Sequence, residues 1–162
     1  MEGKVVVVKM AEIGVVEDSK LLKTTLGSCV GVILHDRKKY LSGMAHIMLP
    51  QKLGDDTMVG KYADTAIPAL LSRLLRRGSN RENIRAYLAG GANMFEFSGD
   101  MKIATVGEKN IVATKRILGE LNIPIAYEET GGRQGRTVLF DNHNGEIHVK
   151  TLDNAIWKGD RA

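Results

Sequence analysis

The sequence has little cysteine, few aromatic residues and no long apolar segment, and each scarcity excludes a class of protein. Its 162 residues include one cysteine, so an internal disulfide cannot hold the fold together. No apolar run approaches the roughly 20 residues that cross a bilayer. The opening residues "MEGKVVVVKM" lack the pattern of a signal peptide. We therefore expect a cytoplasmic protein with no direct membrane insertion.

Charge and aromatic content argue against a nucleic-acid-binding protein. The net charge is only +4, which is modest for a protein that binds the phosphate backbone. Aromatic residues make up 5% of the chain, so side chains that could stack on bases are scarce. The one basic cluster, Arg73 to Arg81, is typical of the solvated end of a helix. With 43% apolar residues and no linker or repeat, the chain is expected to form one domain over residues 1–162.

Metal-binding and phosphate-binding motifs are also missing. The histidines, the cysteine and the carboxylates show no recognised ligand spacing. The segment "AGGAN", Ala89 to Asn93, lacks the lysine and hydroxyl residue of a phosphate loop and the dinucleotide fingerprint, which favours a structural turn. We expect neither a metal nor an organic cofactor.

The remaining pattern predicts a mixed fold with more strands than helices. Apolar spacing predicts amphipathic helices over 62–77 and 107–123, and Pro68 requires the first helix to begin close to it or to kink there. Strands are predicted over 4–10, 29–35, 40–49 and 124–130, within 83–95, and in a hairpin over 131–151. Because several strands are consecutive, we expect an α+β class with mixed, largely antiparallel sheets rather than a doubly wound parallel sheet.

The stretch "LGSCVGVILHD" places Cys29 after a Gly-Ser turn, at the start of a predicted strand. Backbone amides in such a turn can stabilise a thiolate and a developing oxyanion, whereas a free cysteine is more often an inert buried residue. If the following hairpin closes around 37–39, opposite residues have numbers that sum to about 76, which pairs Cys29 with Ile47 or His46. His46 is then a candidate base or, alternatively, a hydrogen-bonded core histidine. His35, His143 and His148 are weaker partners.

Six blocks of sequence together resemble the CheD family of chemoreceptor glutamine deamidases. They run in order from about residue 24 to 150 and read "TTLGSCVGVILHD", "GMAHIMLP", "GKYADTAIPALL", "AGGANMF", "GEKN" and "EETGGRQGR". The resemblance implies a cysteine hydrolase that converts receptor glutamines to glutamate with release of ammonia. It implies a layered α/β sandwich similar to the catalytic domain of cytotoxic necrotizing factor toxins. It also implies methyl-accepting chemoreceptors as substrate, and as partner the phosphatase CheC, which links the family to phosphorylated CheY.

The same resemblance implies roles for particular residues. The family nucleophile falls on Cys29, its histidine on His46, and its threonine on Thr24 or Thr25, of which we favour Thr24. Residues expected to border the substrate and the oxyanion are Gly27, Ser28, Gly90 and Gly91. Two other functions stay open: a regulatory module that binds CheC and receptors without catalysis, and a receptor methylesterase that uses the same cysteine.

Overall fold

The computed structural model describes residues 3–94 and 105–152, in which the chain forms two mixed sheets and two main helices. The five-stranded sheet has the order β2 (Ile13–Glu17), β5 (Leu41–Ile47), β4 (Val30–Asp36), β6 (Ile84–Gly90) and β7 (Ile125–Thr130). The four-stranded sheet has the order β1 (Val5–Val7), β3 (Leu21–Leu26), β8 (Arg136–Asp141) and β9 (Ile147–Thr151). The helices are α1 (Ala63–Arg76) and α2 (Val106–Glu120), with short 3₁₀ turns η1 (Val59–Lys61) and η2 (Arg81–Asn83).

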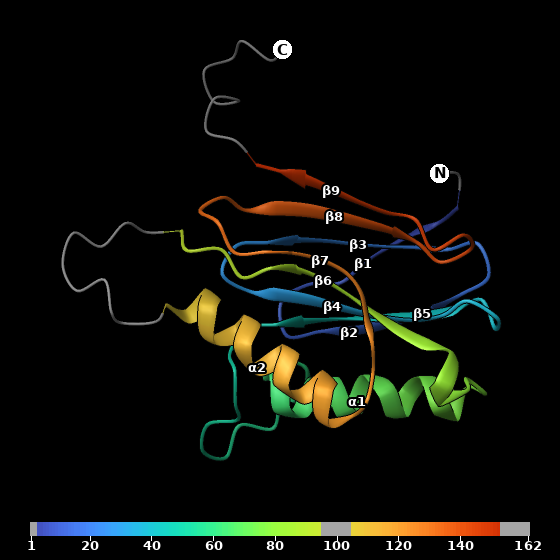
Figure 1. The fold of residues 1–162 in the computed structure, drawn as a ribbon, viewed down its shortest axis with the longest axis horizontal. Helices are drawn as coiled ribbons and strands as arrows, with labels where there is room; N and C mark the ends of the chain where they lie inside the picture. The colour runs from blue at the N-terminus through green and yellow to red at the C-terminus, as the bar shows by residue number, and fades with distance from the viewer. Residues whose placement is uncertain (1–2, 95–104, 153–162) are drawn as a thin grey trace, which may run out of the picture.

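The elements stack as three layers, with both helices on one face of the five-stranded sheet and the four-stranded sheet on the other (Figure 1). One apolar cluster joins α1 and α2 to β4, β5 and β6, and a second fills the space between the sheets. All seven residues of β4 are buried because this strand is central and covered on both faces. The predicted class, with two amphipathic helices and largely antiparallel sheets, is confirmed.

Most predicted elements are present, with boundaries shifted by a few residues. The helix predicted over 62–77 begins at Ala63 and continues through Pro68, which is exposed on its surface. The late hairpin forms between β8 and β9 as predicted. Two strands, β2 and β3, were not predicted. Phe95, which ends the block "AGGANMF", lies outside the described residues.

The predicted register of the hairpin formed by β4 and β5 is wrong by one position. The last pair before the turn is Asp36 opposite Leu41, so the turn contains four residues rather than three and opposite residues sum to 77. Tyr40 closes this turn in the left-handed region, with φ of 49°. His46 therefore lies opposite Gly31, and Cys29 precedes the first pair of the ladder. Extended by one residue, this register sets Cys29 opposite Met48, so Cys29 and His46 are offset by two residues across the hairpin instead of directly opposed.

No helix in the described ranges is long and apolar enough to cross a membrane.

Candidate active site

Cys29 lies in the loop 27–29, which carries the chain from β3 in one sheet to β4 in the other. It is half-buried and packs against the apolar cluster between the sheets. Because the loop crosses between layers, its backbone groups are not used by either ladder. The thiol is therefore held at one end of the inter-sheet space, among backbone groups that need partners from elsewhere.

The turn at Gly90 and Gly91 supplies two of those partners. The Gly91 N–H donates to the carbonyl of Cys29 at 2.8 Å, and the Ala92 N–H donates to the carbonyl of Gly27 at 3.0 Å. Gly90 has φ of 104°, and a Cβ at this position would lie 2.3 Å from the Cys29 carbonyl oxygen. Only glycine allows such a close approach with this backbone conformation. The predicted substrate-binding glycines 90 and 91 are thus buried beside the cysteine loop and support its backbone.

The amide hydrogens of the loop are left free by this arrangement. In the described part of the chain, no acceptor is recorded for the N–H groups of Ser28 and Cys29. The carbonyl of Ser28 accepts from the Asn110 side chain at 3.0 Å. Two adjacent unpaired N–H groups next to a thiol are the donors that an oxyanion requires.

His46, on β5, faces the space between the sheets and is 3% exposed. Its Nδ1 lies 2.8 Å from the hydroxyl of Thr24, and that hydroxyl lies 2.6 Å from the carbonyl of Val8. A carbonyl can only accept, so Thr24 donates its proton to Val8 and accepts from His46. This chain places the proton of neutral His46 on Nδ1 and leaves the lone pair on Nε2.

The alternation of β3 distinguishes the two candidate threonines. Thr24 is 2% exposed and lies on the inward face with its neighbours Leu22 and Leu26. Thr25 is exposed on the outer face, where its hydroxyl lies 3.3 Å from that of Thr137. Thr24 is therefore the threonine that contacts His46, as the sequence analysis favoured, while its part in catalysis stays a prediction.

Replacing these adjacent threonines by valine should have different effects. Thr24→Val keeps the shape of the side chain but removes the hydroxyl that accepts from His46 Nδ1 and donates to the Val8 carbonyl. We expect about 1–3 kcal/mol of lost stability and a fall in deamidation rate of about tenfold or more. Thr25→Val should change stability by no more than about 0.5 kcal/mol and leave the rate unaltered. Equal rates in the two variants, measured beside thermal unfolding, would remove Thr24 from the site.

Burial keeps both reactive groups neutral. It raises the pKa of the Cys29 thiol above its ordinary value. It also lowers the pKa of His46, and the Val8 carbonyl and the charge of Glu12 oppose this shift only partly. Within the described residues the thiol has no hydrogen-bond partner. The two resting groups are therefore a thiol and a neutral imidazole, and hydrogen bonds between catalytic groups that are long or absent in a free enzyme commonly form when substrate is bound.

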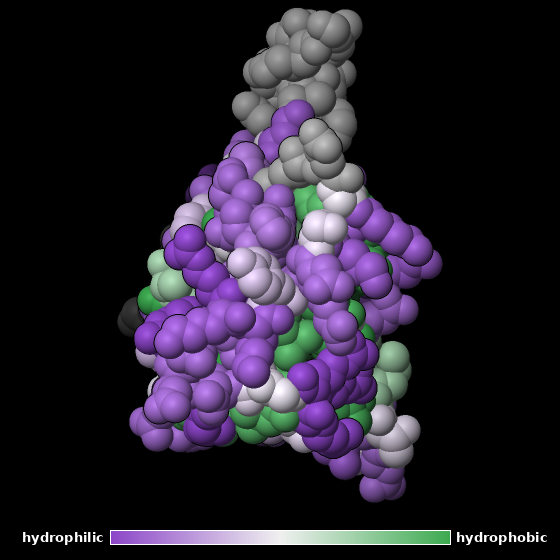
Figure 2. All heavy atoms as spheres, turned by 90° about the vertical axis from the view of Figure 1, so that its right-hand side faces the viewer, coloured by the Kyte–Doolittle hydropathy of each residue, from purple (hydrophilic) through white to green (hydrophobic). Residues whose placement is uncertain are grey.

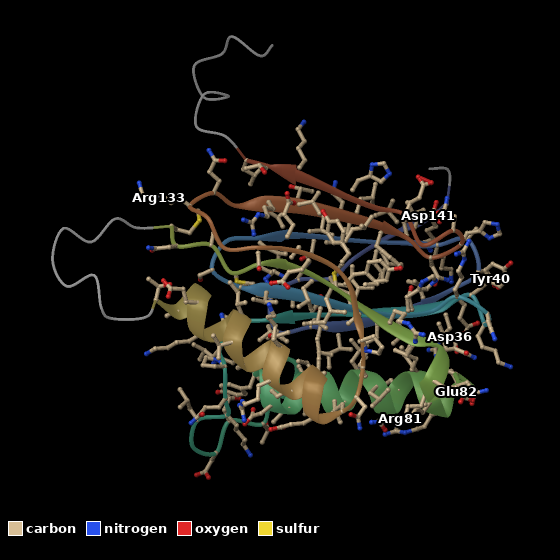
Figure 3. The ribbon with its side chains drawn as sticks, viewed as in Figure 1. Asp36, Tyr40, Arg81, Glu82, Arg133 and Asp141 are labelled. Atoms are coloured by element: carbon tan, nitrogen blue, oxygen red, sulfur yellow. The ribbon has the colours of Figure 1, made fainter. Side chains whose placement is uncertain are left out.

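The other histidines, His35, His143 and His148, lie away from the end of the sheets that carries Cys29 and His46. The Nε2 of His35 is 3.1 Å from the carbonyl of Asn142, and the ring of His143 stacks on Tyr40 at 5.2 Å. Asp36, Tyr40 and Asp141 lie at the end of the sheets opposite Arg133 (Figure 3). That end presents a mostly hydrophilic surface (Figure 2). His148 is exposed on β9.

The described residues contain no group of three or more His, Cys, Asp and Glu that could hold a metal ion.

The fold and this constellation define a class: a two-sheet α+β protein with a half-buried cysteine, a histidine and a threonine at one end of its sheets. A family model described as "CheD chemotactic sensory transduction" matches residues 48–151. The chain belongs to the CheD family. The matched range begins after Cys29 and His46 and so includes neither residue.

Three curated relatives cover nearly the whole chain. The probable chemoreceptor glutamine deamidase CheD of Caldanaerobacter subterraneus subsp. tengcongensis is 41% identical over 96% of this chain and 98% of that protein. The chemoreceptor glutamine deamidase CheD of Halalkalibacterium halodurans is 43% identical over 91% and 94%. The probable deamidase of the same name from Methanococcus vannielii is 44% identical over 88% and 92%.

Two contributors to the site were missed by the sequence analysis. Val8, which accepts from Thr24, offers only a backbone carbonyl, which no side-chain pattern could reveal. Asn110, which holds the Ser28 carbonyl, ends the block "GEKN". A polar residue at a buried position of an amphipathic helix was the available signal.

Proposed function

We propose that this protein is a cysteine-dependent chemoreceptor glutamine deamidase. The observation that carries the proposal is the hydrogen-bond chain from Val8 through Thr24 to His46, because it leaves Nε2 as a proton acceptor on the strand beside the cysteine. The free N–H groups of Ser28 and Cys29 add support. So do the names of the curated relatives, which describe them as chemoreceptor glutamine deamidases.

The proposed reaction proceeds through a thioester. As Cys29 Sγ attacks the side-chain amide carbon of glutamine, His46 Nε2 takes the thiol proton. The N–H groups of Ser28 and Cys29 stabilise the negative charge that develops on the amide oxygen. His46 then returns the proton to the leaving nitrogen, which departs as ammonia. A water molecule deprotonated by His46 hydrolyses the thioester to glutamate and frees the thiol.

Exposed apolar side chains near this end could contact the receptor. Met94 approaches the Cys29 loop at Gly27, and Val106 opens α2 beside it. The segment joining β5 to α1 exposes Leu53, Met58 and Val59. Five exposed apolar groups on segments that border one end are suited to a helical partner laid across them. We propose that CheC, the second partner implied by the family resemblance, also binds there.

We propose the cytoplasm as the place of the reaction, since the chain's only cysteine is a free thiol and a reducing compartment preserves it.

Mass spectrometry of a purified receptor incubated with the protein tests this function. We expect particular receptor glutamine peptides to gain about one dalton, because hydrolysis replaces an amide NH₂ by OH. Loss of about 14 daltons from methylated peptides would instead indicate an esterase using the same thioester route. Unchanged receptor peptides, from a protein that still binds the receptor, would favour the regulatory binding module.

A further inference from the structure

Asn110 on α2 is fully buried, and its amide bridges the two segments that carry the reactive side chains. Its Nδ2 lies 3.0 Å from the carbonyl oxygen of Ser28 and 3.0 Å from that of Met48. Ser28 precedes Cys29, and Met48 follows His46 by two residues. Because both carbonyls can only accept, the NH₂ group must face them, which fixes the orientation of the amide.

Peptide geometry gives this contact a chemical consequence. In a trans peptide the C=O and the following N–H point in opposite directions. When Asn110 holds the Ser28 carbonyl toward α2, it turns the N–H of Cys29 away from α2, and that N–H has no acceptor in the described part of the chain. The Ser28 N–H is directed in the same manner, because the Gly27 carbonyl is held by Ala92.

We propose that Asn110 is the positioning residue of the oxyanion site: it orients the Cys29 N–H and fixes the separation between the nucleophile loop and the histidine strand. This rests on the proposed function, in which Cys29 is the nucleophile. Asn110 touches neither the thiol nor the imidazole, so it acts only through the backbone.

The N-terminal part of α2, which carries Asn110 toward the cysteine loop, is fixed by close packing and by a helix cap. Gly107 packs where a Cβ would lie 2.5 Å from the carbonyl oxygens of Gly91 and Ala92, in the turn that supports Cys29. Thr105 caps the helix by accepting from the Glu108 N–H at 3.2 Å. The helix, the glycine turn and the cysteine loop therefore share backbone contacts, and Asn110 is the side chain that links them to β5.

The same helix offers a matched control. Thr114 lies one turn beyond Asn110, is equally buried, and has a hydroxyl without a partner in the described ranges. Thr114→Val removes a buried polar atom without breaking a recorded hydrogen bond, so it perturbs the helix face but leaves the Ser28 carbonyl held.

The test compares two reactions of Cys29 in the full-length protein. With 4-nitrophenyl acetate, Sγ attacks the carbonyl through a tetrahedral oxyanion, expels 4-nitrophenolate and becomes an acetyl thioester. With iodoacetamide, Sγ displaces iodide from a saturated carbon and no oxyanion forms. In Asn110→Ala we expect the ratio of acylation to alkylation rates to fall by about 10- to 100-fold. In Thr114→Val the ratio should match that of the unsubstituted protein.

An unchanged ratio in folded Asn110→Ala would overturn the proposal, as would an equal fall in both rates accompanied by a lower melting temperature. If Asn110→Ala does not fold, Asn110→Leu decides, because leucine keeps the branched shape of the side chain but donates to neither carbonyl, and a ratio equal to the unsubstituted value would be contrary to the proposal. Failure of the proposed function has a different signature: acylation depends on Asn110, yet receptor glutamines are not converted.

Discussion

Cys29→Ser and Cys29→Ala should each abolish receptor deamidation while the protein stays folded. A serine hydroxyl has a far higher pKa than a thiol, so His46 would deprotonate it much less readily, and alanine has no nucleophile at all. We expect the rate, followed by the one-dalton change in receptor peptides, to fall by about four orders of magnitude or more. Because Cys29 is only half-buried, the loss of stability should be about 1 kcal/mol.

The melting temperature of each cysteine variant is the control for this experiment. A variant that melts like the unsubstituted protein and still converts glutamine would remove Cys29 as the nucleophile. Reaction with iodoacetamide gives a second check, since the chain has no other thiol to be labelled.

His46→Gln should lower the deamidation rate by about 10²- to 10⁴-fold, because an unassisted thiol must then lose its proton to water. The pH dependence identifies the cause. A base acts only when neutral, so kcat/KM in the unsubstituted protein should rise with pH through the pKa of His46 and then level. Since burial lowers this pKa, the rise should lie at lower pH than for an ordinary histidine. In the variant this step should be absent, and the residual rate should climb steadily toward the raised pKa of Cys29.

His35 provides the matched control for His46. It is buried at the opposite end of β4, and burial lowers its pKa too, while its Nε2 contacts a backbone carbonyl. His35→Gln should reduce stability but keep both the rate and the acid step of the profile. If both histidine variants lose activity in proportion to their stability, His46 is a core histidine and not the base.

The parts of the site that lie in one hairpin could be anticipated from the sequence. The glycine turn before Cys29, the charged turn after Asp36 and the returning apolar run predict two adjacent strands, and these exist. What the sequence did not reveal was the length of the turn. Tyr40 adopts a left-handed backbone, which is unusual for a residue that is not glycine, and it adds one residue to the loop.

The strand β3 was overlooked although its signal was present. Leu22, Thr24 and Leu26 alternate with two exposed residues, which is the period of a half-buried strand, but the run is short and begins with two leucines. Its pairing with β8 joins residues more than 100 positions apart in the chain, a contact that local patterning does not encode. The choice between Thr24 and Thr25 depended on the face of this strand.

Residues from both sheets form the candidate site. The site is therefore complete only when the two sheets are packed against each other. Thr24 belongs to the four-stranded sheet, whereas His46 belongs to the five-stranded sheet and Cys29 immediately precedes its central strand. A compact intermediate that has formed every strand but has not yet packed one layer on the other would retain its secondary structure. In such an intermediate the Thr24 hydroxyl would not contact His46. The tautomer and the orientation of the His46 ring would then not be fixed. In the proposed mechanism, catalysis therefore requires the two sheets to be packed against each other, so an incompletely folded copy in the cell would leave receptors unmodified.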